Sequence, residues 1–315
     1  MKKFVALALL SSCFGAYAST DTCQIKNLRE VIVFTSGSIS AFKSDFQGTV
    51  AAGGDVYLED FYLDQTKCLS LTSAGQAALA FGSVKNSMEG LKSVAIMNAR
   101  VNGALRSNGD IYVSSANTDK AIGPKRPLTK NSNYFKFEKR SITPTANFND
   151  LNRQMITLSK ELAALPSNME IKVSGNKVIL KAKNKANSIT LSTQSLPLLT
   201  ENLIEIHAKE NQQVTINFEG TLVALQGLGV ELYGSVRPAD INWNFKDAQS
   251  LFIKNTANAY YGIPGTVIAP NADVEFYEGL ITGALYAKSI IYTDLSKGLK
   301  TGQINDGRPS DLPLE

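Results

Sequence analysis

Short runs of alternating apolar and polar residues, broken by Gly, Asn, Ser and Asp, fill residues 31–115. Such runs are typical of short β-strands joined by tight turns. Five runs in the chain share one pattern, a glycine, a small residue, Leu or Val, any residue, and then Ala or Ser; they begin at Gly48, Gly103, Gly220, Gly265 and Gly283. The glycine tolerates the positive φ of a corner, and the next four residues read as a strand. The repeat therefore predicts a chain coiled on itself, a β-solenoid.

The spacing of the copies indicates the size of one coil. Gly265 and Gly283 lie 18 residues apart, which suits a three-sided coil with strands of about 5–6 residues. Residues 46–58 align with residues 101–113 at an offset of 55, close to three such coils. The other gaps between copies are not multiples of 18, so we expect insertions in the coil.

One stretch has helical periodicity, and a helix is predicted at about residues 147–165. Asn147 or Asn149 can cap its start, and Pro166 ends it. Its apolar residues share one face: Phe148, Leu151, Met155, Leu158, Leu162 and Leu165. A lone amphipathic helix must bury such a stripe, so we expect it to pack on the flank of the solenoid.

The predicted organisation is a single all-β domain over residues 19–315, an irregular β-solenoid (β-helix) with this long amphipathic helix on its flank. Basic residues and prolines at about residues 117–140 predict a mobile loop inserted in the coil. The segments around residues 171–173, 177–183, 188–191, 203–208 and 213–218 read as further strands.

The N-terminus has the anatomy of a secretory signal peptide over residues 1–18. Lys2 and Lys3 form its basic start, and an apolar run leads to a small-x-small cleavage site ending at Ala18. Cleavage after Ala18 predicts a secreted, periplasmic or cell-surface protein. A lipoprotein signal acylated at Cys13 is the alternative. No second hydrophobic span follows, so no integral membrane segment is expected after cleavage.

Either cleavage leaves Cys23 and Cys68 as a pair of cysteines available for a bond. Two cysteines in an exported protein favour a disulfide bond, while two buried free thiols are the alternative. A zinc site is a poorer interpretation, because two cysteines and a single histidine cannot complete a tetrahedral ligand set without carboxylates.

The charge of the chain does not indicate a nucleic-acid partner. Its formal charge is +4, and loss of Lys2 and Lys3 with the signal peptide would lower it to +2. No phosphate loop, dinucleotide fingerprint or zinc motif is present, so no cofactor is expected. His207 is the only histidine, and we interpret it as a strand histidine hydrogen-bonded to a neighbour rather than as a catalytic or metal-binding residue.

Two clusters of charge call for a functional interpretation. The first is acidic, and calcium binding competes there with simple turn hydrogen bonds: Asp55, Glu59, Asp60 and Asp64. The second is a basic strip: Lys177, Lys181, Lys183 and Lys185 share parity on one predicted strand and project from one face, and Lys172 lies nearby. The basic strip is either a solvated sheet edge or a contact for an anionic surface.

Several motifs resemble the choice-of-anchor A domain of bacterial exported proteins. They occur in the order of that family and cover about residues 31–305: 44–56, 148–165, 242–245, 263–272, 279–289 and 302–305. The resemblance implies a β-solenoid with an associated helix, an adhesive role and no catalytic residues. The chain departs from the family in showing no C-terminal anchor motif and in its basic insertion.

These observations predict an exported, non-catalytic, adhesin-like protein that binds a cell-surface glycan or matrix component. A glycan-active β-helix enzyme is one alternative, and it would need clustered carboxylates in a groove. Ice binding is another, and it would need regular ranks of threonine. Thr49, Thr221 and Thr266 recur after corner glycines, but Ala104 and Ala284 interrupt the series.

Overall fold

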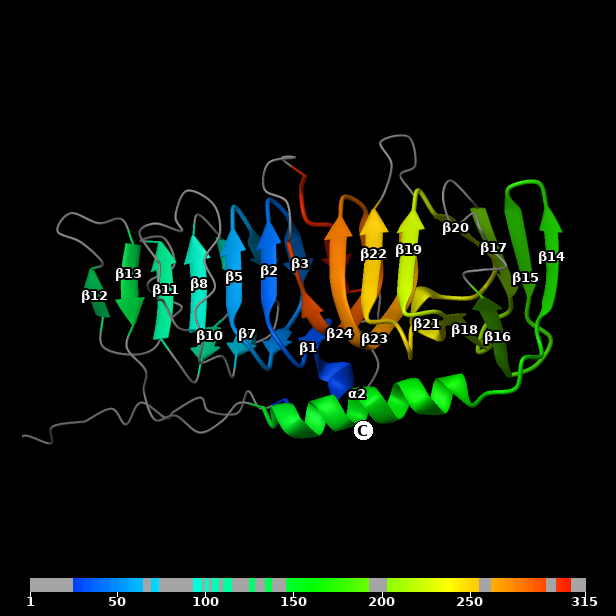
Figure 1. Ribbon diagram of the computed structural model, residues 1–315, viewed down its shortest axis with the longest axis horizontal. Helices are drawn as coiled ribbons and strands as arrows, with labels where there is room; N and C mark the ends of the chain where they lie inside the picture. Colours follow the sequence, from blue (N-terminus) through cyan, green and yellow to red (C-terminus); the bar gives the residue numbers. More distant parts are fainter. Residues whose placement is uncertain are drawn as a thin grey trace, which may run out of the picture.

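The computed structural model describes the following residues: 25–64, 69–73, 93–97, 100–101, 104–107, 110–114, 125–127, 134–137, 146–192, 203–254, 262–292 and 299–306. This part of the chain is mostly β-strand with one long α-helix, as the sequence predicts. The strands lie side by side along the long axis of an elongated molecule, and the helix runs beneath them (Figure 1). Residues 1–18, expected to be a signal peptide, and Cys13, Cys23 and Cys68 lie outside the described residues.

The strands form parallel ladders, and the first ladder is the one that the helix contacts. Its members, in spatial order, are β16 (Ala186–Ser192), β18 (Gln213–Glu219), β21 (Ile241–Asn244), part of β23 (Ile263–Tyr277), part of β24 (Leu280–Ile290), β1 (Val33–Thr35), β4 (Val50–Ala52), β7 (Leu69–Ser73) and β10 (Ala104–Ser107).

A second parallel ladder uses the later parts of β23 and β24. It runs through β19 (Leu222–Gln226), β22 (Ser250–Lys254), β23, β24, β2 (Ile39–Phe42), β5 (Val56–Glu59), β8 (Ser93–Met97) and β11 (Asp110–Ser114). Two antiparallel strands extend it, β13 (Tyr134–Phe137) and β12 (Lys125–Pro127). Both lie within the basic stretch expected to be a loop, so that stretch contributes strands to the sheet.

A third series of parallel strands pairs with the start of β24. The start of β24 pairs with β25 (Gln303–Asn305). Next to β25 in the same ladder lie β3 (Asp45–Gln47), β6 (Tyr62–Asp64) and β9 (Arg100–Val101), in that order. A separate four-stranded sheet contains β14 (Glu170–Ser174), β15 (Lys177–Lys181), β17 (Leu203–Ala208) and β20 (Gly229–Gly234). The short 3₁₀ helices are η1 (Leu28–Glu30) and η4 (Pro238–Asp240).

The core is built from side chains at alternating positions of the strands. Because the strands pair in register, these side chains stack on one another. In the first ladder Val267 pairs with Leu285, Leu285 with Val33, and Val33 with Val50. All four side chains are fully buried. Strand periodicity places every second residue inward, so one coil after another contributes an aliphatic side chain to the same column.

The 18-residue step predicted between Gly265 and Gly283 is confirmed as the register of β23 and β24. The two glycines are direct partners in the ladder between β23 and β24. Gly265 has φ +114°, which favours glycine, and Gly283 approaches the Gly265 carbonyl so closely that a Cβ would lie 2.1 Å from its oxygen.

The interpretation of the 55-residue offset as three coils is wrong. Val50 pairs with Leu71, and Leu71 pairs with Leu105, so the offset spans two ladder steps. The first step takes 21 residues and the second takes 34. Coil length is therefore not constant, because the connections between strands differ in length while the strand spacing does not.

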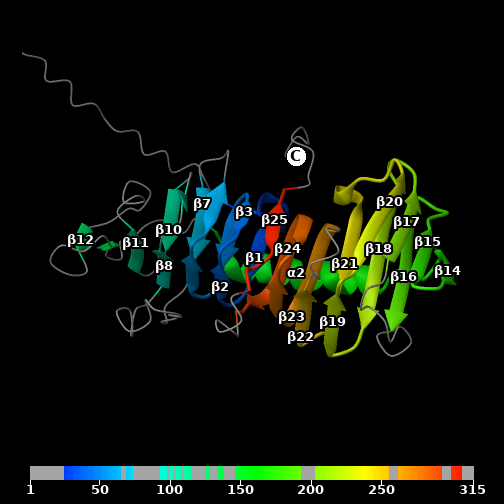
Figure 2. The ribbon, with the colours of Figure 1, turned by 90° about the horizontal axis from the view of Figure 1, so that it is seen from above.

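The predicted helix is confirmed as α2 (Phe148–Ala163), and Asn147 is its N-cap. The Asn147 side chain accepts a hydrogen bond from the Asp150 amide. Leu151 and Met155 are buried against outward residues of the first ladder, among them Phe34. The helix thus covers one flank of the strands, as the view from above shows (Figure 2).

A buried polar network also fixes the helix on the ladder. The Ser159 hydroxyl donates to Asn244 Oδ1 at 2.6 Å, and Asn244 Nδ2 donates to the Ser159 carbonyl at 2.9 Å. Asn244 Nδ2 also donates to Asn217 Oδ1 at 2.7 Å, and Asn217 Nδ2 donates to the Leu162 carbonyl at 3.1 Å. These bonds join the helix to β18 and β21 in a single arrangement.

The early and late parts of the chain meet at a seam in the middle of the molecule. We define the seam as the pairings of β1 with β24 and of β3 with β25. From this seam the N-terminal strands extend toward β12 and the C-terminal strands toward β14 (Figure 1). Both outer ends of the molecule are therefore built from internal segments of the chain.

Candidate binding face

The four-stranded sheet of β14, β15, β17 and β20 brings most of the predicted basic strip together. In β15 and β17 the inward side chains are buried, including Val178, Leu180, Ile204 and Ile206. Residues between them project outward. We call this outer surface the lysine face; its members are Lys172, Lys177, Lys181, Glu205, His207, Glu231 and Tyr233.

An ion pair and a histidine contact fix Glu205 on the lysine face. Lys177 Nζ donates to Glu205 Oε1 at 2.8 Å, and His207 Nε2 lies 3.3 Å from Glu205 Oε2. The hydrogen bond from Lys177, followed by that with His207, lowers the pKa of Glu205, and the same ion pair raises the pKa of Lys177. The interpretation of His207 as a strand histidine hydrogen-bonded to a neighbour is confirmed.

A stacked pair of rings lies beside this ion pair. His207 and Tyr233 are register partners on β17 and β20, and their rings stack with centroids 4.5 Å apart and planes 8° apart. The Tyr233 hydroxyl donates to Glu231 Oε2 at 2.8 Å, and this bond raises the pKa of Tyr233. Tyr233 remains 41% exposed, so the stack is held in place yet accessible.

The five predicted lysines have different environments. Lys177 pairs with Glu205, and Lys183 pairs with Glu170 at 3.2 Å. Lys172, Lys181 and Lys185 are exposed and form no ion pair with a described residue. Lys183 and Lys185 follow β15 rather than belonging to it. Contact of this strip with an anionic surface stays a prediction.

Sequence reasoning missed Glu205, Glu231 and Tyr233. Their signal was a repeated spacing, because Glu205 and His207 recur as Glu231 and Tyr233 at an offset of 26 residues. The register confirms this offset, since Glu205 pairs with Glu231 and His207 with Tyr233. Each carboxylate thus contacts a ring two residues later on its own strand.

The acidic residues singled out from the sequence are Asp55, Glu59, Asp60 and Asp64, and the side chain of Asp64 lies outside the part that the structure describes. No group of at least three His, Cys, Asp or Glu side chains there is placed to hold an ion. Glu59 instead accepts a hydrogen bond from the Tyr57 hydroxyl at 2.6 Å. Nor does any helix among the described residues have the length and apolar character needed to cross a membrane.

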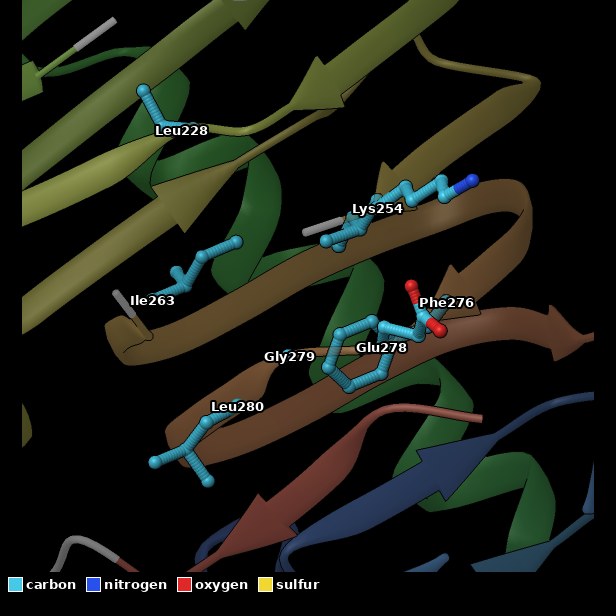
Figure 3. Close-up of a pocket in the computed structure, with 8 residues that line it drawn as sticks. Leu228, Lys254, Ile263, Phe276, Glu278, Gly279 and Leu280 are labelled. Atoms are coloured by element: carbon cyan, nitrogen blue, oxygen red, sulfur yellow. The ribbon is translucent and has the colours of Figure 1, made fainter. Parts of the chain in front are cut away.

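A small pocket lies at the corner between β22, β23 and β24, where the charged groups of Lys254 and Glu278 flank apolar side chains (Figure 3). Its lining is Leu228, Ile253, Lys254, Ile263, Phe276, Glu278, Gly279 and Leu280. It has room for about one water molecule and none for a sugar ring. The extended outer surface of the sheet is therefore the better candidate for ligand binding.

Stacked parallel strands with an ordered outer face are typical of proteins that bind extended partners. Residues 31–298 match the family described as "Putative Ice-binding-like adhesive domain", and the chain belongs to this family. The match supports the adhesin-like prediction at this coarser level, and it is to a family other than the choice-of-anchor A domain.

Comparisons with individual proteins give distant likenesses. No curated protein matches the chain. An ice-binding protein from the Antarctic ascomycete Antarctomyces psychrotrophicus is 10% identical, with a TM-score of 0.36 over 89% of this chain and 92% of that one. An ice-binding protein from an Antarctic biological consortium is 14% identical, with a TM-score of 0.28 over 88% of this chain and 84% of that one.

Proposed function

We propose that this protein is an exported, non-catalytic adhesin that binds a surface or matrix component, such as a cell-surface glycan, through the lysine face. The observation that carries the proposal is the in-register row of Lys181, His207 and Tyr233 across three neighbouring strands. Membership in an adhesive-domain family supports it.

The architecture suits attachment to an extended partner. We infer that the whole coil is a β-solenoid, because its parallel ladders repeat with an 18-residue step at Gly265 and Gly283. Neighbouring strands in such a coil are about 4.8 Å apart, so outward side chains recur at a fixed spacing. A rigid row of this kind is complementary to a polymer or a surface that also repeats.

The proposal includes export. The signal sequence over residues 1–18, with cleavage after Ala18 or acylation at Cys13, supports a secreted, periplasmic or cell-surface location. A disulfide bond between Cys23 and Cys68 fits that compartment. The ordered motifs over residues 31–305 also support a finer relationship to choice-of-anchor A domains.

Ice binding is the second candidate, and one row of polar residues favours it. Ser188, Thr215, Asn242 and Thr266 are successive partners in the first ladder. Ser188 and Thr215 are buried, however, and Ala284 follows Thr266 in the row. The second ladder presents a mixed surface instead of threonine ranks: Leu222, Ala224, Phe252, Lys254 and Glu275. Adhesion is therefore the better-supported function.

A binding screen tests the proposed function. The mature protein is applied to a glycan array and to whole cells, with and without EDTA, and a heat-denatured sample serves as the control. We expect saturable binding that EDTA does not abolish. Absence of binding to every glycan and cell type would contradict adhesion, as would robust glycan depolymerisation lost on mutating a carboxylate pair. Thermal hysteresis at micromolar protein would support the ice-binding candidate instead.

A further inference from the structure

We propose that the lysine face binds an acidic polysaccharide, with the Tyr233 and His207 rings as the platform for a sugar ring and Lys172 and Lys181 as the contacts for its carboxylates. The inference deepens the proposed function and rests on it. It assigns a ligand class and a named contact to one end of the molecule.

The ring stack has the properties of a platform. Tyr233 stacks on His207 with planes 8° apart, and the Tyr233 side chain is still 41% exposed. A tyrosine offers a large, rigid, amphipathic surface at a low entropic cost of ordering. The bond from the Tyr233 hydroxyl to Glu231 and the contact of His207 with Glu205 fix both rings before a ligand arrives.

The charges around the stack favour an acidic ligand over a neutral one. Glu205 is already bound by Lys177, and Glu231 already accepts the Tyr233 hydroxyl. Lys172 and Lys181 form no ion pair with a described residue and are exposed. Their ammonium groups are therefore available to carboxylates of a ligand, and the Lys177 ion pair offsets the charge of Glu205.

The register places these groups along the path of a linear polymer. Lys181, His207 and Tyr233 lie opposite one another on β15, β17 and β20, so the row crosses the strands at steps of about 4.8 Å. Lys172 on β14 pairs with Ile179 on β15, so it lies diagonal to Lys181. A polysaccharide laid across the strands meets both lysines and the ring stack together.

A nucleic acid or an anionic membrane fits this face less well. Binding to a phosphate backbone uses many cationic contacts, and the formal charge of the whole chain is only +4. Short single-stranded DNA and phosphatidylglycerol vesicles therefore enter the experiment as competing ligands.

The experiment measures binding of the full mature chain to polygalacturonate, with dextran as the neutral probe, by biolayer interferometry. We expect binding to polygalacturonate that weakens as salt rises, because exposed charges are screened, and no binding to dextran. Equal binding to dextran, or tighter binding to DNA or to the vesicles, would overturn the proposal.

Variants separate the ring platform from the charge. Tyr233→Ala should weaken polygalacturonate binding about tenfold, a loss on the scale of one aromatic contact, whereas Tyr233→Phe keeps the ring, loses only the bond to Glu231 and should weaken binding less than Tyr233→Ala does. The double variant Lys172→Ala and Lys181→Ala should bind weakly and lose most of the salt dependence. Two control variants should bind as wild type: Leu222→Ala, exposed on the second ladder, and the double variant Lys160→Ala and Lys300→Ala.

The outcomes distinguish this inference from the proposed function. If wild type binds polygalacturonate and the lysine-face variants bind equally well with unchanged thermal unfolding, the ligand lies elsewhere and the inference is wrong. If wild type binds cells or other glycans but not polygalacturonate, the inference is wrong and adhesion stands. If wild type binds no surface at all, the proposed function itself is wrong.

Discussion

Gly265 and Gly283 show how single residues determine the coil. A Cβ at Gly265 would lie 2.4 Å from the Ile241 carbonyl oxygen, and one at Gly283 would lie 2.1 Å from the Gly265 carbonyl oxygen. Side chains never approach a backbone so closely without displacing it. Glycine is therefore required at both positions, which lie within β23 and β24, by the stacking distance as well as by the backbone dihedral.

Substitution of Gly283 by alanine should lower the free energy of unfolding by about 3 kcal/mol, because the coil must open at the corner. Gly175→Ala is the matched control, since Gly175 has φ +60° but no neighbouring atom within 4 Å of the place that a methyl group would take. It should cost only about 1 kcal/mol of backbone strain. Urea unfolding measures both, and equal losses would show that crowding at the corner does not matter.

The pKa of Glu205 makes part of the stability depend on pH. Its folded pKa lies below its usual value near 4.5, so Glu205 stabilises the fold fully above that value. The contribution disappears as the pH falls through the lower folded pKa. The Glu205→Gln variant should therefore be less stable than wild type at neutral pH, and the difference should vanish in acid.

Chemical unfolding at several pH values tests this dependence. Glu161→Gln is the control, because Glu161 is an exposed residue of α2 with no ion pair to a described residue. Its effect on the free energy of unfolding at neutral pH should be smaller than that of Glu205→Gln. A constant difference between wild type and Glu205→Gln would show that the ion pair with Lys177 adds no stability.

At the scale of elements, α2 is positioned by polar contacts as well as by its apolar stripe. Ser159 is fully buried and bonds Asn244 in both directions, through its hydroxyl and its carbonyl. Apolar contacts alone would allow a helix to slide along the ladder. The network with Asn244 and Asn217 selects one register, because a shift would leave buried amides unpaired.

Replacing Ser159 with alanine should destabilise the protein by about 1–3 kcal/mol, since Asn244 Oδ1 loses its donor in a buried site. Thr157→Ala, an exposed hydroxyl on the same helix, is the matched control and should change stability by less than about 0.5 kcal/mol. Thermal unfolding compares the two. Similar effects would mean that the polar network does not hold the helix.

The elements themselves were largely predictable, because local periodicity determines them. The helix expected at 147–165 occupies Phe148–Ala163, and the strands expected near 177–183 and 203–208 are β15 and β17. The burial of Ser159 was not predicted, because a polar residue does not count toward the apolar stripe from which the buried face of the helix was inferred. The 55-residue offset misled because the sequence does not reveal how long each connection between strands is.

The candidate site was only half predictable for a related reason. Strand parity showed that Lys177 and Lys181 share a face, which is a local property. The ion pair joins Lys177 and Glu205, which lie 28 residues apart on different strands. The register between two strands cannot be predicted from the sequence of either strand alone. The glutamates and Tyr233 therefore became visible only in the folded chain.

At the scale of the whole molecule, the seam joins strands that are far apart in sequence. Val33 pairs with Leu285, and Phe46 with Ile304. An aromatic contact joins the same two parts of the chain, since the ring centroids of Phe42 and Tyr292 lie 4.7 Å apart. The N-terminal and C-terminal parts of the molecule thus stabilise each other. In a repeat protein wound in sequence order, by contrast, each repeat contacts only its sequence neighbours.

Deleting residues 299–315 should destabilise both halves. The deletion removes the buried Ile304 and the Thr301 hydroxyl that accepts the Phe42 amide at 2.8 Å. We expect a loss of at least about 4 kcal/mol, from the buried side chain and the unpaired edges of β3 and β24. Deletion of residues 307–315 alone keeps β25 and is the control. Circular dichroism measures the melting temperatures of the two truncated proteins. Equal melting temperatures would contradict the role of the seam.

The position of the seam has a consequence for the length of the molecule. Two arms extend from it in opposite directions, one ending at β12 and the other at β14 (Figure 1). An additional coil inserted near the end of either arm would move its terminal strands outward by about 4.8 Å and leave the seam contacts unchanged. Each arm can therefore be lengthened independently, and the distance from the seam to the lysine face depends on the number of coils in one arm alone.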